Sequence, residues 1–140
     1  MGCKIDYKPE EGRMKITNPV LLQSFADEFE LPDGPAPLTP AEPGKILHAA
    51  AEGDAQSLGP AEHSLFRRGV GKLLHMDKKS RPEIKHAVRD LTRAASNPTR
   101  GHMDAVLRCM KHCAATPNRG LVVEPNARWD GNPEFLFEVA

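Results

Sequence analysis

Residues 61–120 contain three successive helical patterns, and this feature most limits the folds open to the chain. Within each pattern, apolar residues recur at spacings of three and four, as on the buried face of an amphipathic helix. The three stripes are Phe66, Val70, Leu73 and Leu74; Ile84, Ala87, Val88, Leu91 and Ala95; and Met103, Val106, Leu107, Met110, Cys113 and Ala114. Three such stripes predict a bundle of helices around one aliphatic core.

Boundary signals divide the three patterns. Ser80 and Glu83 have the spacing of a capping box, with Pro82 in the first turn of the helix that they would open. The Asn97-Pro98 step ends that helix. Gly69 and Gly71 would weaken the preceding helix, which begins near Ala61, unless another element packs closely against it.

The N-terminal region predicts a β-hairpin followed by a helix. Apolar and polar residues alternate on both sides of a turn at residues 9–12 (Pro-Glu-Glu-Gly), which predicts a hairpin over residues 2–17. Asn18 is suited to cap the next helix, and Pro19 fits its first position. The apolar face of this helix would consist of Leu22, Phe25, Ala26 and Phe29, with an end near Leu31.

Two further segments contain few helical signals. Residues 32–60 hold 6 Pro and 4 Gly in 29 positions, which predicts a long, poorly packed linker with one brief helical turn over residues 46–51. Near the C-terminus, residues 121–123 and 135–139 are apolar. They flank a turn-rich stretch that includes Trp129, and they predict two short strands.

These patterns together predict an α+β fold with four regions. Residues 1–31 form the hairpin and a helix, and residues 32–60 form a flexible Pro/Gly-rich loop. Residues 61–120 form a basic three-helix bundle, and residues 121–140 form short strands. A chain of 140 residues suits one domain.

Positive charge is concentrated in the helical region. The chain has no net charge, yet residues 61–120 carry 13 Lys and Arg against 5 Asp and Glu. Such a block indicates a polyanionic partner, although a solvated helix surface has the same composition. Cations bind phosphate backbones without reading bases. The candidate nucleic-acid-binding residues are Arg67, Arg68, Lys72, Arg81, Lys85, Arg89, Arg93, Arg100, Arg108 and Lys111.

Other chemistries have weaker signals. Cys109, His112 and Cys113, preceded by His102, have helical spacing but lack a second compact ligand pair, so packing is expected rather than a metal site. No pair of adjacent aspartates, nucleophile elbow or phosphate-binding loop occurs, and no cofactor is expected. The sequence has no signal peptide and no apolar run of membrane-spanning length. Free thiols and an intracellular location are expected.

The motifs between residues 66 and 121 resemble the reverse transcriptase region of copia-type retrotransposon polyproteins. The run from Phe66 to Leu74 is similar to that family's Tyr-Arg-x-x-x-Gly-x-Leu-Leu motif, and Arg81 to Ile84 is similar to its Arg-Pro-Asp-Ile motif. The order continues through Pro98, His102, Ala105, Arg108, Thr116, Gly120 and Leu121. The hairpin with Gly2, the helix to Phe29 and Thr39-Pro40 also fit. The departures are Glu83, His75, Met103 and His112.

The resemblance implies the thumb and connection region of the polymerase, which holds a primer–template duplex of RNA–DNA or DNA. In that family, the palm Asp-Asp motif would precede Met1 and the ribonuclease H acidic residues would follow Ala140. The Mg²⁺ ions would belong to those segments, which would also be protein partners. The implied location is the cytoplasm, a virus-like particle or the nucleus. No activity is expected of this chain in isolation, and a domesticated helical module that binds a protein is the alternative.

Overall fold

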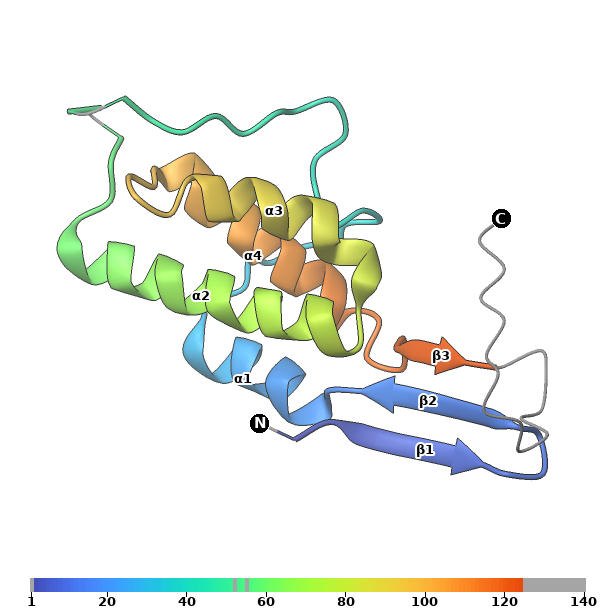
Figure 1. Ribbon diagram of the computed structural model, residues 1–140. Helices are drawn as coiled ribbons and strands as arrows, with labels where there is room; N and C mark the ends of the chain where they lie inside the picture. The colour runs from blue at the N-terminus through green and yellow to red at the C-terminus, as the bar shows by residue number, and fades with distance from the viewer. Residues whose placement is uncertain (1, 52, 55, 125–140) are drawn as a thin grey trace.

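The computed structural model describes residues 2–51, 53–54 and 56–124 and has an α+β fold, as predicted. A small antiparallel sheet lies at one end of a group of helices (Figure 1). In chain order, the elements are β1 (Lys4–Lys8), β2 (Arg13–Thr17), α1 (Pro19–Glu28), α2 (Pro60–Lys79), a 3-10 turn (Pro82–Ile84), α3 (Lys85–Arg93), α4 (Arg100–Ala114) and β3 (Leu121–Val123).

The predicted hairpin is confirmed, and β3 extends it to three strands. The turn between β1 and β2 is closed by hydrogen bonds from the Glu11 amide to the Lys8 carbonyl and from the Gly12 amide to the Pro9 carbonyl. Gly12 has a φ of 63°, a conformation that a residue with a Cβ rarely adopts. β2 occupies the centre of the sheet, between β1 and β3.

Helix α1 begins as predicted but buries a different stripe. Pro19 occupies the first turn, whereas the Asn18 side chain makes no cap and donates a hydrogen bond to Cys3 Sγ at 3.2 Å. Leu21, Phe25 and Phe29 are buried, while Leu22 is half-buried and Ala26 exposed. The i, i+4, i+8 spacing of the three buried residues turns one narrow stripe towards the core.

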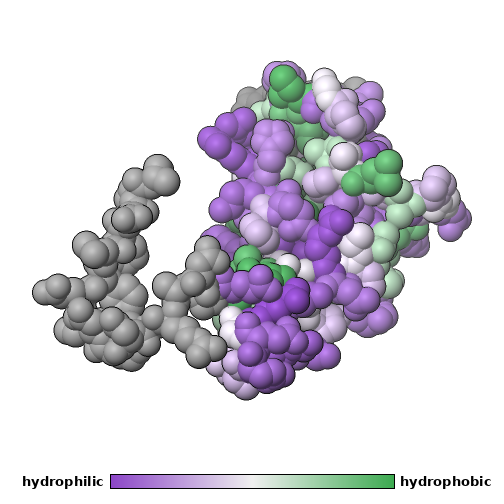
Figure 2. Space-filling model, turned by 90° about the vertical axis from the view of Figure 1, so that its right-hand side faces the viewer, coloured by the Kyte–Doolittle hydropathy of each residue, from purple (hydrophilic) through white to green (hydrophobic). Residues whose placement is uncertain are grey.

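Helices α1 to α4 share a single hydrophobic cluster. It joins the α1 residues to most of the predicted stripes of α2, α3 and α4. At Gly69, a Cβ would lie 2.9 Å from Val106 Cγ1, 3.2 Å from Phe29 Cε1 and 3.3 Å from Met110 Cε. The absence of a side chain at Gly69 therefore allows α1 and α4 to pack closely against α2, the condition under which the sequence analysis accepted a glycine in this helix. On the face shown in Figure 2, hydrophilic residues predominate and apolar residues form separate patches.

The capping box predicted at Ser80 is wrong. Ser80 is instead the C-terminal cap of α2, and its amide donates to the Met76 carbonyl at 2.9 Å. The Glu83 carboxylate accepts a hydrogen bond from Arg81 Nε instead of reaching back to Ser80. A capping interaction occurs at α4, where the Thr99 amide donates to His102 Nδ1 at 2.9 Å.

The linker between α1 and α2 contains no helix among its described residues, so the helical turn predicted over residues 46–51 is wrong. The linker is nevertheless held against α4 and the α3–α4 turn. His102 Nε2 donates to the His48 carbonyl at 2.9 Å, and Asn97 Nδ2 donates to the Ala51 carbonyl at 2.8 Å. Leu58 and Pro98 are joined by a backbone hydrogen bond of 3.0 Å. Because proline has no backbone N–H, the Pro-rich linker has few donors of its own for its carbonyl groups. These carbonyls can therefore accept hydrogen bonds from side chains of α4.

Only part of the predicted C-terminal structure can be compared. The strand predicted over residues 121–123 is confirmed as β3, which pairs antiparallel with β2. The second predicted strand, residues 135–139, and Trp129 lie outside the described residues.

Candidate nucleic-acid interface

The ten cations selected from the sequence occupy different environments. Two are buried, three on α4 contact other parts of the chain, and the remaining five are exposed on α2 and α3. Sequence charge alone placed them in one group. Their environments separate those that stabilise the fold from those that could bind a ligand.

Lys72 faces α1 and is not available to a phosphate backbone. Its side chain is 9% exposed, and its Nζ lies 2.7 Å from Glu28 Oε1. The same ammonium donates a hydrogen bond to Ser24 Oγ at 2.8 Å. Helix α1 begins more than 40 residues before Lys72, so the local helical pattern gave no sign of these partners. The assignment of Lys72 to the interface is therefore corrected.

Arg81 is also buried, with 1% of its side chain exposed, and its assignment to the interface is corrected in the same way. Its guanidinium bonds to Glu83 Oε1 and donates to the Thr116 carbonyl at 3.0 Å and to Thr116 Oγ1 at 2.8 Å. Thr116 lies two residues after the end of α4, a helix terminus at which unpaired carbonyls favour a cation. Arg81 thus fastens the α2–α3 turn to the C-terminal end of α4.

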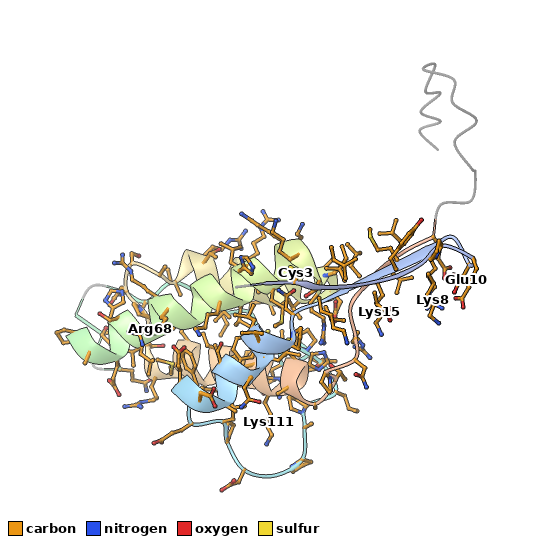
Figure 3. The ribbon with its side chains drawn as sticks, turned by 90° about the horizontal axis from the view of Figure 1, so that it is seen from below. Cys3, Lys8, Glu10, Lys15, Arg68 and Lys111 are labelled. Atoms are coloured by element: carbon orange, nitrogen blue, oxygen red, sulfur yellow. The ribbon has the colours of Figure 1, made fainter. Side chains whose placement is uncertain are left out.

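The cations of α4 contact the linker or α2. Arg108 Nη2 donates to Thr39 Oγ1 at 3.2 Å, and Lys111 Nζ donates to the Pro32 carbonyl at 2.5 Å. Figure 3 shows Lys111 beside the linker. Arg100 forms an ion pair with Glu62 at 3.0 Å. Arg108 and Lys111 are half-buried, and these three residues do not join the cations of α3.

Exposed cations form one surface across α2 and α3, which we call the α2–α3 basic surface. It consists of Arg67, Lys78, Lys85, Arg89 and Arg93. At 100° per residue, the first two lie on nearly the same side of α2, three turns apart. The last three lie at i, i+4 and i+8 on α3. All five side chains are accessible to solvent.

The two helices present these side chains side by side. α2 and α3 pack together and run in opposite directions (Figure 1). On α3, Ala87, Asp90 and Leu91 line a hollow of about 210 Å³ shared with α4 and the linker. Lys85 lies on the opposite edge of α3 and is exposed. The basic surface therefore consists of exposed cations carried by two packed, antiparallel helices.

Neighbouring acidic groups offset little of this charge. Arg93 Nη1 lies 3.7 Å from Asp90 Oδ1, and Arg68 Nη1, at the other edge of α2, lies 3.8 Å from Glu28 Oε2. At these distances, and with both arginine side chains 59% exposed, the two pairs contribute little. Among the described residues, Arg67, Lys85 and Arg89 make no side-chain ion pair or hydrogen bond.

Two features of this surface were missed by the sequence prediction. The first is Lys78, which is exposed in the last turn of α2. Cations at a helix C-terminus are favoured by the helix dipole, so their presence there was recognisable but was not used. Gly71 is the second feature. Added there, a Cβ would meet nothing within 4 Å, so Gly71 lies open between Arg67 and Lys78.

The cysteine–histidine group of α4 is part of the core. Cys109 and Cys113 are fully buried free thiols. A hydrogen bond between them, together with burial, raises the pKa of Cys109, and the same bond lowers the pKa of Cys113. His102 and His112 are bonded to linker carbonyls. In the part of the chain that the structure describes, no three His, Cys, Asp or Glu residues gather in a metal-binding arrangement.

Residues 2–51, 53–54 and 56–124 include no helix with the length and apolar character that a bilayer crossing requires. Comparison of the chain with models of protein families, with curated proteins and with solved structures gives no match.

Proposed function

We propose that this chain holds a nucleic-acid duplex through the α2–α3 basic surface, as a noncatalytic part of a copia-type reverse transcriptase. One observation carries the proposal: five exposed cations lie together on two packed helices. A regular array of this kind suits the phosphates of a duplex, with no contact to base edges.

The division between buried and exposed cations supports the proposal. Lys72 and Arg81 are bonded within the fold, whereas Arg67, Lys85 and Arg89 make no side-chain hydrogen bond or ion pair among the described residues. In the resembling motif, the buried Arg81 and the following Pro82 set the turn between α2 and α3. That turn brings Lys85 beside the end of α2 that carries Lys78. Arg81 and Pro82 would then contribute to duplex binding indirectly, because the turn that they set positions the exposed cations of α2 and α3.

The test is binding to an RNA–DNA hybrid measured over a range of salt concentrations. Arg89→Ala combined with Arg93→Ala should weaken binding. The slope of log affinity against log salt concentration should become shallower by about 0.9 for each phosphate that the variant no longer neutralises. The weakening should be similar for unrelated sequences of the duplex, because backbone contacts carry no sequence information.

A matched control removes two charges elsewhere. Lys45 and Arg100 are exposed, are not members of the α2–α3 basic surface, and form ion pairs with Glu42 and Glu62 at 3.1 and 3.0 Å. Lys45→Ala with Arg100→Ala gives the same net charge as the test variant. Equal weakening by both variants would mean that overall charge, rather than this surface, binds the duplex. An absence of binding by the unmodified chain would overturn the proposal.

A second candidate function is a helical interaction module that binds a protein partner. It is favoured by the exposed apolar side chains of the sheet, where Ile5 is 60% exposed and Tyr7 is 64% exposed. Size-exclusion chromatography of the chain with and without a candidate partner distinguishes the two. If the chain elutes as a monomer, binds the duplex and binds no protein, the interaction-module function is excluded and duplex binding is retained.

A further inference from the structure

The three-stranded sheet has one apolar and one polar face. In antiparallel pairing, residues directly opposite each other project to the same side. Ile5 pairs with Ile16 and Tyr7 with Met14 across β1 and β2, and Ile16 and Met14 pair with Leu121 and Val123 of β3. We call this set the apolar sheet face: Ile5, Tyr7, Met14, Ile16, Leu121 and Val123.

The polar face of the sheet, and not the apolar face, is turned towards the helices. Lys4, Asp6, Lys15 and Thr17 line a hollow of about 450 Å³ together with residues of α1 and of the turn after α4. Figure 3 shows Lys8 and Lys15 on the same side of the hairpin. Because side chains alternate along a strand, the apolar sheet face points away from the helical core.

This orientation leaves large apolar side chains in contact with solvent. Ile5 is 60%, Tyr7 64% and Val123 39% exposed, whereas the core residues of the helices are at most 7% exposed. A sheet in water normally turns its apolar face inward. Exposed apolar patches typically mark surfaces that take part in a contact.

The sequence that follows β3 contains a suitable segment. Residues 125–140 follow Glu124, whose Oε1 lies 2.9 Å from Arg13 Nε at the start of β2. The segment contains Trp129, Phe135, Leu136, Phe137 and Val139. It therefore starts at the sheet and carries five large apolar side chains.

The segment is long enough to reach every strand. Strands are about 4.8 Å apart and an extended residue spans about 3.3 Å, so a few residues cross the three-stranded sheet. Ten residues separate Glu124 from Phe135. A segment attached at the edge of its target also has a high effective concentration, which favours it over a second molecule.

We infer that residues 125–140 pack their apolar side chains against the apolar sheet face and so complete the fold at this end of the molecule. This inference is independent of duplex binding, which uses the α2–α3 basic surface. It assigns to the chain itself the surface that would otherwise serve a protein partner.

Trp129 provides the test because it is the single tryptophan of the chain. Val122 and Val123 are a matched pair: they are neighbours on β3, 40% and 39% exposed, and they project to opposite faces of the sheet. The fluorescence of Trp129 and its quenching by acrylamide would be measured for the full chain and for Val122→Ser, Val123→Ser and Tyr7→Ser. Far-UV circular dichroism of each variant reports whether the helices are retained.

In the unmodified chain, we expect blue-shifted emission, protection from acrylamide and no dependence on protein concentration. Val123→Ser and Tyr7→Ser should shift the emission towards that of solvated tryptophan and lose the protection. Val122→Ser should change neither. Solvated Trp129 in the unmodified chain, equal effects of the two valine variants, or protection that appears only at high concentration or with an added protein would each overturn the inference.

Discussion

Helices α2 and α3 carry cations and glycines both on the inner side, which packs against the rest of the chain, and on the outer side, which faces solvent. The same residue types have different roles on the two sides. On the inner side, Lys72 and Arg81 are bonded to other parts of the chain, and Gly69 is closely packed. On the outer side, cations such as Arg89 are solvated, and a Cβ added at Gly71 would meet no other part of the chain within 4 Å. Residue type and helical position therefore do not determine the role of a cation, which depends on its partners from distant segments.

The two sides also differ in what a mutation should disturb. A buried cation that satisfies several acceptors leaves them unpaired when it is removed, which destabilises the fold. A solvated cation leaves nothing unpaired, so its removal should affect only ligand binding. Stability measurements on matched inner and outer variants therefore test the comparison directly.

The largest effect is expected for Arg81→Ala. The change removes hydrogen bonds to Glu83, the Thr116 carbonyl and Thr116 Oγ1 from a side chain that is 1% exposed. It should lower the free energy of unfolding by about 3 kcal/mol, the usual cost of breaking a buried charged network. Urea denaturation followed by circular dichroism measures the change.

Arg89→Ala is the outer control for this prediction. Its side chain is exposed, and surface substitutions usually alter stability by about 0.5 kcal/mol or less. The comparison would fail if Arg81→Ala and Arg89→Ala destabilised the chain equally. If Arg81→Ala also weakened duplex binding, the buried arginine would be shown to position Lys85 through the α2–α3 turn.

The next effect is expected for Gly69→Ala. The added Cβ would lie 2.9 Å from Val106 Cγ1 and 3.2 Å from Phe29 Cε1, closer than packed carbon atoms permit. Separation of α2 from its neighbours should cost about 1–3 kcal/mol, the usual range for overpacking. The denaturation midpoint should fall without a change in slope. An unchanged or higher midpoint would contradict the close packing of α2, α1 and α4.

A smaller effect is expected for Lys72→Ala. The change deprives Glu28 and Ser24 of the ammonium, but the Glu28 side chain is 38% exposed and can be solvated again. The expected destabilisation is about 1–2 kcal/mol, and Arg67→Ala on the outer side should change stability much less. Thermal unfolding of the two variants measures the difference. Equal melting temperatures of Lys72→Ala and Arg67→Ala would mean that Lys72, like the solvated Arg67, does not stabilise the fold.

Local patterns predicted the elements whose causes are local. The hairpin turn at Gly12 and the helices with three- and four-residue apolar spacing were recognisable from neighbouring residues. The condition of close packing that the sequence set for Gly69 and Gly71 is met only at Gly69, through residues of distant segments. The Ser80 cap was mistaken because α2 continues to Lys79 and takes Ser80 as its C-terminal cap. A short motif such as Ser80 to Glu83 does not indicate whether its first residue is the N-terminal cap of the following helix or the C-terminal cap of the preceding one.

Long-range contacts explain the rest. The partners of Lys72 and Arg81 are 44 and 35 residues away, and that of Lys111 is 79 residues away. The linker, predicted to be poorly packed, is bound by α4 through carbonyls that composition does not reveal. Half of the predicted interface therefore had other partners, which a count of charges could not indicate.

The smallest effect is expected for Gly71→Ala, and its sign is opposite to that of Gly69→Ala. Apart from the adjacent backbone of α2, no atom lies within 4 Å of the new Cβ, and Gly71 has an ordinary helical conformation in α2. Alanine should therefore stabilise the chain by about 0.5–1 kcal/mol through its higher helix propensity. Urea denaturation measures the change, and destabilisation would mean that the outer side is also packed. If the duplex is held by side chains such as Arg67 and Lys78, its binding should be unchanged; weaker binding of a more stable chain would mean that the phosphates approach the backbone of α2 at Gly71.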